Sequence, residues 1–181
     1  MQNPFLVGER IYLRTLEIED VDCFVKWIND EEVNNYLSVS LPLNKVREKE
    51  FIEGLYKDEN NMILGIALKA NDDLIGVVGL HKISMQFRHS ELGIFIGDKS
   101  RWSKGYGTEA VKIVIKYGFD RLNLHRIFLT VMDFNQRAIN AYEKSGFKRE
   151  GVFREHVYKN GKYCDVYIMG ILKSEWKENG L

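Results

Sequence analysis

The chain has 181 residues, of which 45% are hydrophobic and 12% aromatic, enough to bury one core but short for two. Lysine plus arginine and aspartate plus glutamate both number 26, and neither sign forms a long run, which argues against a nucleic-acid arm or a polybasic membrane patch. No apolar stretch approaches the roughly 20 residues that span a bilayer, and the N-terminus lacks the pattern of a secretory signal. We therefore expect one cytoplasmic domain over residues 1–181.

Hydrophobic periodicity and turn residues predict an ordered series of strands and helices. In chain order the patterns predict a strand over 9–15, helices over 18–28 and 45–56, a hairpin over 62–68 and 74–80, a strand over 91–96, a helix that includes 110–119, a strand over 125–132, a helix over 135–144, and a hairpin over 147–158 and 162–172 turned on Asn160-Gly161. This order is not the regular alternation of a doubly wound fold. It predicts an α+β fold, a mixed sheet with helices packed on it.

Two glycines lie in a short turn between the strand over 91–96 and the helix that follows it. The turn reads Trp102-Ser103-Lys104-Gly105-Tyr106-Gly107-Thr108, and glycines there let backbone N–H groups converge on an anion at a helix N-terminus. A loop that only needs flexible dihedral angles explains the two glycines equally well. The sequence contains neither a P-loop nor a GxGxxG pattern, so those phosphate-binding alternatives are excluded.

A second motif lies downstream and distinguishes between the two interpretations of this turn. Residues 135–147 read Asn-Gln-Arg-Ala-Ile-Asn-Ala-Tyr-Glu-Lys-Ser-Gly-Phe, and together with the turn they resemble the GCN5-related N-acetyltransferase (GNAT) superfamily, whose N-x-x-A-x-x-x-Y-x-x-x-G-F stretch follows a coenzyme-binding turn. The stretches 150–155 and 158–163 resemble the ribosomal-protein N-terminal and spermidine acetyltransferase branches. Trp102 stands where the family's turn most often has Gln or Arg, and Ser103 where relatives commonly have glycine.

The resemblance implies a single GNAT-type domain with a mainly antiparallel mixed sheet, splayed at the coenzyme-binding strands and covered by helices on both faces. It also implies acetyl-CoA as co-substrate. Its pantetheine arm would lie against Ile94, Phe95 and Ile96, its pyrophosphate against the turn from Trp102 to Thr108, and Asn135 would help to hold it. Ile94 and Ile96 are also expected to be core residues, because this binding uses the backbone.

Amide formation needs a neutral amine, an acceptor for its proton and a proton for the departing thiolate. By the resemblance, Tyr142 is the general acid and Glu91 binds the amine or accepts its proton; the alternatives are a core tyrosine and a solvated strand-end charge. An alkylammonium of pKa about 10.4 is only about one part in 2,500 neutral at pH 7, whereas an α-amine of pKa about 8 is near one in ten. A backbone N–H near Phe95 would polarise the thioester, and His81 is a weaker candidate for the acceptor site.

The remaining cysteines and histidines do not predict a metal site. Cys23 and Cys164 lie far apart without ligands at CxxC-like spacing, so we expect packed thiols. The other histidines are too scattered for a cluster: His89, His125 and His156.

The acceptor is expected between the first helices and the late hairpin. The groups to weigh there are the acidic stretch Asp30-Glu31-Glu32 and the stretch Arg154-Glu155-His156, while segment 36–44 contains no acid, which disfavours a polycationic substrate. Three functions remain open: a protein or peptide N-terminal acetyltransferase, which we expect first, a small-molecule acetyltransferase acting on a polyamine, amino sugar or antibiotic, and a non-catalytic acyl-CoA sensor. An open groove would favour the first and an enclosed pocket the second.

A homodimer through the edge hairpins and the aromatic residues Phe153, Tyr158 and Tyr167 is a further expectation.

Overall fold

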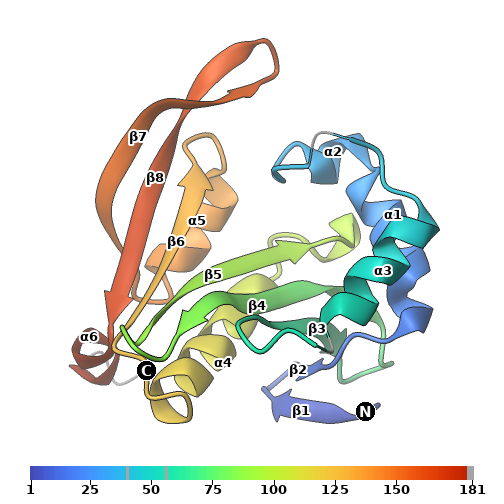
Figure 1. The fold of residues 1–181 in the computed structure, drawn as a ribbon, viewed down its shortest axis with the longest axis horizontal. Coiled ribbons are helices and arrows are strands. Elements are labelled where there is room, and N and C mark those ends of the chain that lie inside the picture. The colour runs from blue at the N-terminus through green and yellow to red at the C-terminus, as the bar shows by residue number, and fades with distance from the viewer. Residues whose placement is uncertain (40, 56, 179–181) are drawn as a thin grey trace.

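The computed structural model describes residues 1–39, 41–55 and 57–178 (Figure 1). Its elements in chain order are β1 (Pro4–Val7), β2 (Ile11–Arg14), the 3₁₀ turn η1 (Ile18–Asp20), α1 (Val21–Ile28), α2 (Glu31–Asn34), α3 (Lys45–Leu55), β3 (Met62–Leu68), β4 (Leu74–Ser84), β5 (His89–Ile96), η2 (Lys99–Arg101), α4 (Tyr106–Asp120), β6 (Arg126–Met132), α5 (Gln136–Glu143), β7 (Lys148–Lys159), β8 (Lys162–Leu172) and α6 (Lys173–Glu178). No helix among the described residues combines the length and apolarity needed to cross a bilayer.

The strands of the described residues form one sheet in the order β1-β2-β3-β4-β5-β6-β8-β7. Every neighbouring pair is antiparallel except β5 and β6, which run parallel. The expected α+β class with a mixed, mainly antiparallel sheet is therefore confirmed.

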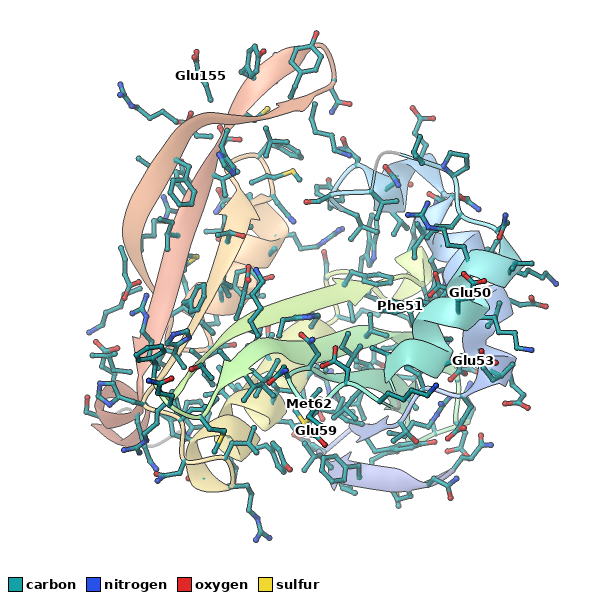
Figure 2. The ribbon with its side chains drawn as sticks, viewed as in Figure 1. Glu50, Phe51, Glu53, Glu59, Met62 and Glu155 are labelled. Carbon is teal, nitrogen blue, oxygen red and sulfur yellow. The ribbon has the colours of Figure 1, made fainter. Side chains whose placement is uncertain are left out.

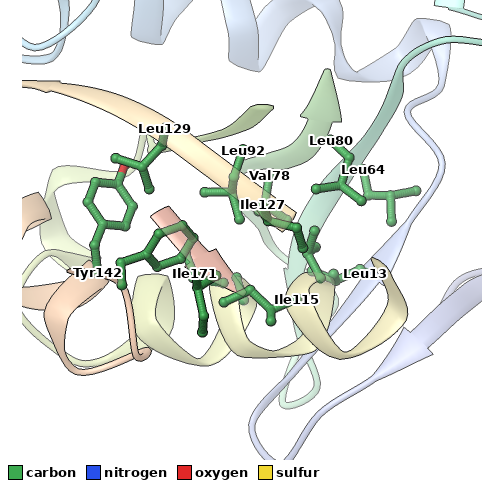
Figure 3. Packing of buried hydrophobic residues seen from close by; sticks show 14 of the residues in the cluster. Leu13, Leu64, Val78, Leu80, Leu92, Ile115, Ile127, Leu129, Tyr142 and Ile171 are labelled. Carbon is green, nitrogen blue, oxygen red and sulfur yellow. The ribbon is translucent and has the colours of Figure 1, made fainter. Parts of the chain in front are cut away.

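Helices cover both faces of this sheet, as expected. The side chains of α4, α5 and α6 join the larger apolar cluster with the inward-facing residues of β2 to β6 and of β8, and Figure 3 shows its packing around Leu80, Ile115 and Ile127. The smaller cluster joins α1, α2 and α3 to the opposite face through Val77 and Phe95. A fully buried Leu, Ile or Val contributes roughly 1.5–3 kcal/mol, so the two clusters hold the central strands from both sides.

The sheet opens between its two parallel strands. β5 and β6 pair at His89 with Arg126, at Ser90 with Ile127 and at Glu91 with Phe128. Beyond Glu91, β5 stays paired with β4 as far as Ile96 but diverges from β6, as Figure 1 shows. The opening leaves one edge of residues 92–96 free for another chain or a ligand.

Several boundaries differ from the expectation. The predicted strand over 9–15 is confined to β2, the predicted helix over 18–28 begins with η1, and β1, α2 and α6 had not been predicted. Residue 56, the predicted end of the second helix, lies outside the described residues. The late hairpin turns on Asn160-Gly161 as predicted, because both residues have positive φ, 53° and 77°.

Candidate active site

A cavity of about 540 Å³ lies beside the open edge of β5 and reaches the turn before α4. It brings together most of the residues predicted for the coenzyme, namely Ile94, Phe95, Ile96, Trp102, Ser103, Gly105, Tyr106, Gly107, Thr108 and Asn135. Lys104 is not among the lining residues. Its carbonyl instead accepts a hydrogen bond from Nη1 of Arg10 at 2.9 Å, which ties the turn to the residue before β2.

The turn itself leaves a helix N-terminus open. Ser103 and Gly105 have positive φ, 58° and 83°, and Gly105 is the N-cap of α4 without a side chain that could cap it. The first N–H groups of an α-helix have no partner within the helix and attract anions. The positive φ at Ser103 explains why a glycine would suit this position better than other residues.

An aromatic stack forms one wall of the cavity. The guanidinium of Arg137 lies 3.6 Å from the ring centroid of Trp102 and 5.1 Å from that of Tyr36. The indole Nε1 of Trp102 donates to the carbonyl oxygen of Ile96 at 2.7 Å. Burial lowers the pKa of Arg137 from its ordinary value, yet an arginine stays charged, so the stack adds a cation to this wall. Sequence reasoning missed Tyr36 and Arg137, because the three members are far apart in the chain.

A second cavity, of about 620 Å³, lies on the other side of the splayed strands. Its polar lining residues are Tyr36, Ser38, Asn61, His81, Lys82, Glu91, Thr130, Asn135, Tyr142 and His156. Of these, Glu91, Tyr142, His81 and His156 were considered from the sequence. Tyr36, Asn135 and Tyr142 also line the first cavity, so they lie where the two meet.

Tyr142 is placed by the helix α5. Asn135 caps this helix by accepting a hydrogen bond from the N–H of Ala138 at 3.2 Å, and the Tyr142 ring packs edge-on against Phe147 at 5.9 Å. Figure 3 shows its hydroxyl end directed toward β6, where Leu129 is labelled. Only 6% of Tyr142 is exposed, and this burial raises its pKa above the ordinary value of 10. The side chain is therefore a neutral phenol throughout the physiological range.

Glu91 lies at the last paired position of β5 and β6. One carboxylate oxygen, Oε2, accepts a hydrogen bond from Nζ of Lys82 at 2.9 Å. This contact raises the pKa of Lys82, which keeps the lysine charged. Glu91 is thus a carboxylate at the splay point, but one that already has a cationic partner.

The acidic stretch at residues 30–32 does not line the second cavity, contrary to expectation. Its acids surround a separate hollow, where Nζ of Lys99 bridges Asp30 at 2.8 Å and Glu32 at 3.1 Å. Asp30 also caps α2 through the N–H groups of residues 32 and 33. Of the stretch 154–156 only His156 lines the second cavity, beside Val157 and Val166 of the same hairpin. Glu155 lies in the outer part of the hairpin, as Figure 2 shows.

The β7–β8 hairpin and α2 are joined at the separate hollow that contains the acidic stretch. Lys159, at the end of β7, donates from Nζ to the carbonyl oxygen of Asn34 at 3.1 Å. Asn160 donates from Nδ2 to Oδ1 of Asn35 at 2.8 Å. These bonds connect the hairpin to the end of α2 across 125 residues of sequence. Their four residues line the separate hollow, not the second cavity.

Comparison with known proteins agrees with this geometry. A family model described as "Acetyltransferase (GNAT) domain" matches residues 10–148. An N-acetyltransferase from Bacillus licheniformis, p20, is 32% identical over 175 residues, covering 94% of this chain and 97% of the relative. The spermidine N(1)-acetyltransferase of Vibrio cholerae is 30% identical over 170 residues, with coverage of 94% and 97%. The crystal structure of spermidine N-acetyltransferase from Vibrio cholerae with CoA and spermine has a TM-score of 0.86 at 28% identity, covering 93% of this chain and 98% of that one.

Proposed function

The chain belongs to the acetyltransferase (GNAT) family, whose members use acetyl-CoA, and on that premise we propose that it acetylates the nitrogen of a small primary amine carrying one positive charge. The observation that carries the proposal is the position of Tyr142 between two cavities. One cavity ends at the open N-terminus of α4, which suits a pyrophosphate. The other contains Glu91 and His81, which suit an amine.

The first cavity supports the expected binding of acetyl-CoA. The free edge of residues 92–96 offers backbone groups to a pantetheine arm, as a neighbouring strand would. The N–H groups of Tyr106, Gly107 and Thr108 begin α4 beside the cavity, and the Arg137 cation lies on the same wall. When bound, acetyl-CoA supplies the thioester, and the protein orients it and excludes water.

Tyr142 is the proposed general acid. Its phenol is buried and neutral, so it can give a proton to the sulfur as negative charge develops there. Glu91 is proposed to face the incoming ammonium and position it. A backbone N–H near Phe95, on the open edge of β5, is the proposed donor to the thioester oxygen.

The second cavity favours a small acceptor with low charge. Among its described lining residues the only carboxylate is Glu91, and Lys82 lies beside it. A polyamine with several ammonium groups would meet one carboxylate and one cation, an unfavourable balance. Its volume of about 620 Å³ is in the range of small-molecule sites.

An acceptor panel tests the proposal. The protein is incubated with acetyl-CoA and either phenethylamine, glucosamine, lysine, spermidine or a seryl-alanine amide, and thiol release is followed together with the mass of the acetylated product. We expect phenethylamine or glucosamine to have the highest kcat/KM. Preference for spermidine would overturn the charge argument, and preference for the dipeptide amide would restore the N-terminal acetyltransferase expected from the sequence. Turnover of none of these amines would contradict the proposed acceptor class.

A further inference from the structure

An irregularity in β4 places two consecutive residues against the same cavity. Side chains normally alternate between the faces of a strand, but the pairing of β4 with β5 shifts register between His81 and Ser84. Lys82 adopts a left-handed φ of 51° in this bulge, and its N–H donates to Oδ1 of Asn61 at 3.0 Å. As a result both His81 and Lys82 line the second cavity. Bulges that redirect side chains in this way are frequent beside active sites.

His81 is held over β5 by a gap in the opposite strand. A Cβ atom built on Gly93 would lie 2.7 Å from Nε2 of His81, closer than any real contact allows. The imidazole therefore occupies the space that a side chain at position 93 would fill. His81 pairs with Glu91 across β4 and β5, and Gly93 lies two residues beyond Glu91 on the same face of β5, next to the edge where the sheet opens.

Among the described groups of the second cavity, His81 is the one that can accept a proton from an amine, because Glu91 already has a cationic partner. Glu91 on β5 is paired with Lys82, and the remaining charged group that acts on the imidazole is Asp58, in the loop before β3. From β7, His156 faces the same cavity. Burial is the largest influence on His81 and lowers its pKa below the ordinary 6.5. The ring is thus neutral at pH 7 with a lone pair to offer.

We propose that His81 removes the proton from the bound ammonium, while Glu91 holds that ammonium in place. This inference rests on the proposed function. His81 takes one proton, directly or through a water, and becomes imidazolium. The neutral nitrogen then forms a bond to the acetyl carbon, the C–S bond breaks, and Tyr142 gives its proton to the sulfur. Tyr142 regains a proton from the newly acylated nitrogen, and His81 releases its own to solvent, so one proton leaves per turnover.

The test is the pH profile of kcat/KM for phenethylamine from pH 5.5 to 9.5 in the wild type and in His81→Gln. If His81 deprotonates a bound ammonium, wild-type kcat/KM is constant at pH values between the pKa of His81 and the pKa of the amine. It decreases when the pH is lowered below the pKa of His81. In His81→Gln only amine that is already neutral reacts, so kcat/KM rises about tenfold per pH unit, in proportion to the neutral fraction. At pH 7, kcat/KM of His81→Gln is expected to be at least about 10²-fold lower than that of the wild type, and this difference should decrease as the pH rises.

Matched variants separate this role from a structural one. His125→Gln alters an exposed histidine outside both cavities and is expected to keep the wild-type profile. Gly93→Ala keeps His81 but pushes its ring aside, and is expected to reproduce the profile of His81→Gln. Gly54→Ala, where a Cβ meets nothing within 4 Å, is the control for that change. Thermal unfolding of each variant shows whether it is folded. If His81→Gln is not folded, the pH profile of Gly93→Ala is used as the test instead.

A uniform loss at every pH, with the level region retained, would overturn the role of His81 while leaving the proposed function intact. If the wild type itself acetylates no amine of the panel, the proposed function fails, and the role of His81 fails with it. The two failures are distinguishable because the first concerns the shape of a profile and the second its existence.

Discussion

Tyr142 shows how the surroundings of one side chain decide what chemistry it can perform. In water a tyrosine of pKa about 10 can either give or take a proton over an accessible pH range. Burial between α5 and β6 disfavours the phenolate and raises the pKa. The residue is therefore suited to give a proton to a developing thiolate, and unsuited to deprotonate an amine.

Replacing Tyr142 by Phe should lower kcat by about 10²-fold or more, because the thiolate then leaves without a positioned proton donor. The KM for acetyl-CoA should change little, since the ring and its packing against Phe147 remain. Steady-state kinetics with both substrates varied measures this. Tyr158→Phe, on the exposed tip of the hairpin, is the control. A variant with undiminished kcat would show that the proton comes from elsewhere.

At this scale the sequence predicted what lies close together in the chain. The glycine turn and the stretch from Asn135 to Phe147 are local patterns, and the structure places both beside one cavity. The stack of Tyr36, Trp102 and Arg137 is different, because its members come from three segments that are far apart in the sequence. The sequence placed His81 after the end of a strand, because the predicted strand ended at Leu80, whereas β4 continues to Ser84.

Among the elements, β2 and η1 are joined by a buried ion pair. Nη1 and Nη2 of Arg14 each donate to a carboxylate oxygen of Asp20 at 2.8 Å, and both side chains are at most 10% exposed. Asp20 also accepts from the N–H of Glu17 at 2.9 Å. This pair fixes the direction in which the chain enters α1.

Removing the charge of Asp20 by Asn should destabilise the protein by about 3–5 kcal/mol, because Arg14 would remain buried without its counter-ion. Equilibrium unfolding in urea measures the change. Glu53→Gln breaks the exposed pair with Lys49, in which both side chains are more than half exposed, and should cost no more than about 1 kcal/mol. Equal effects of the two substitutions would contradict the assigned importance of burial.

Elements were predictable where their signals are local and regular. The hairpin of β3 and β4 and that of β7 and β8 followed from turn residues between apolar runs. β1 and α2 have four residues each, too few for a period to emerge. The bulge after His81 interrupts the alternation of β4, so the pattern alone ended the strand early.

At the scale of the whole molecule, the second cavity is lined by residues from distant parts of the chain, from Tyr36 to Val166. α2 and the tip of the β7–β8 hairpin meet through Lys159 and Asn160, which no sequence period encodes. The acidic stretch at 30–32, which the sequence left as a group to weigh for the acceptor, lies outside the second cavity. The charges of Asp30 and Glu32 are engaged by Lys99, which precedes the glycine turn.

The divergence of β5 from β6 also divides the sheet into two halves, which are joined only at the three paired positions of β5 and β6 among the described residues. Backbone amides of residues 92–96 that do not bond to β4 must exchange their protons with solvent readily while this edge is open. Acetyl-CoA bound along the edge would shield them and join the halves, adding about 2.7 kcal/mol of stability at a hundredfold excess over Kd. Deuterium uptake by this segment should therefore slow sharply when acetyl-CoA is added, while the segment of α3 exchanges as before. The substrate would in this way complete the architecture that binds it.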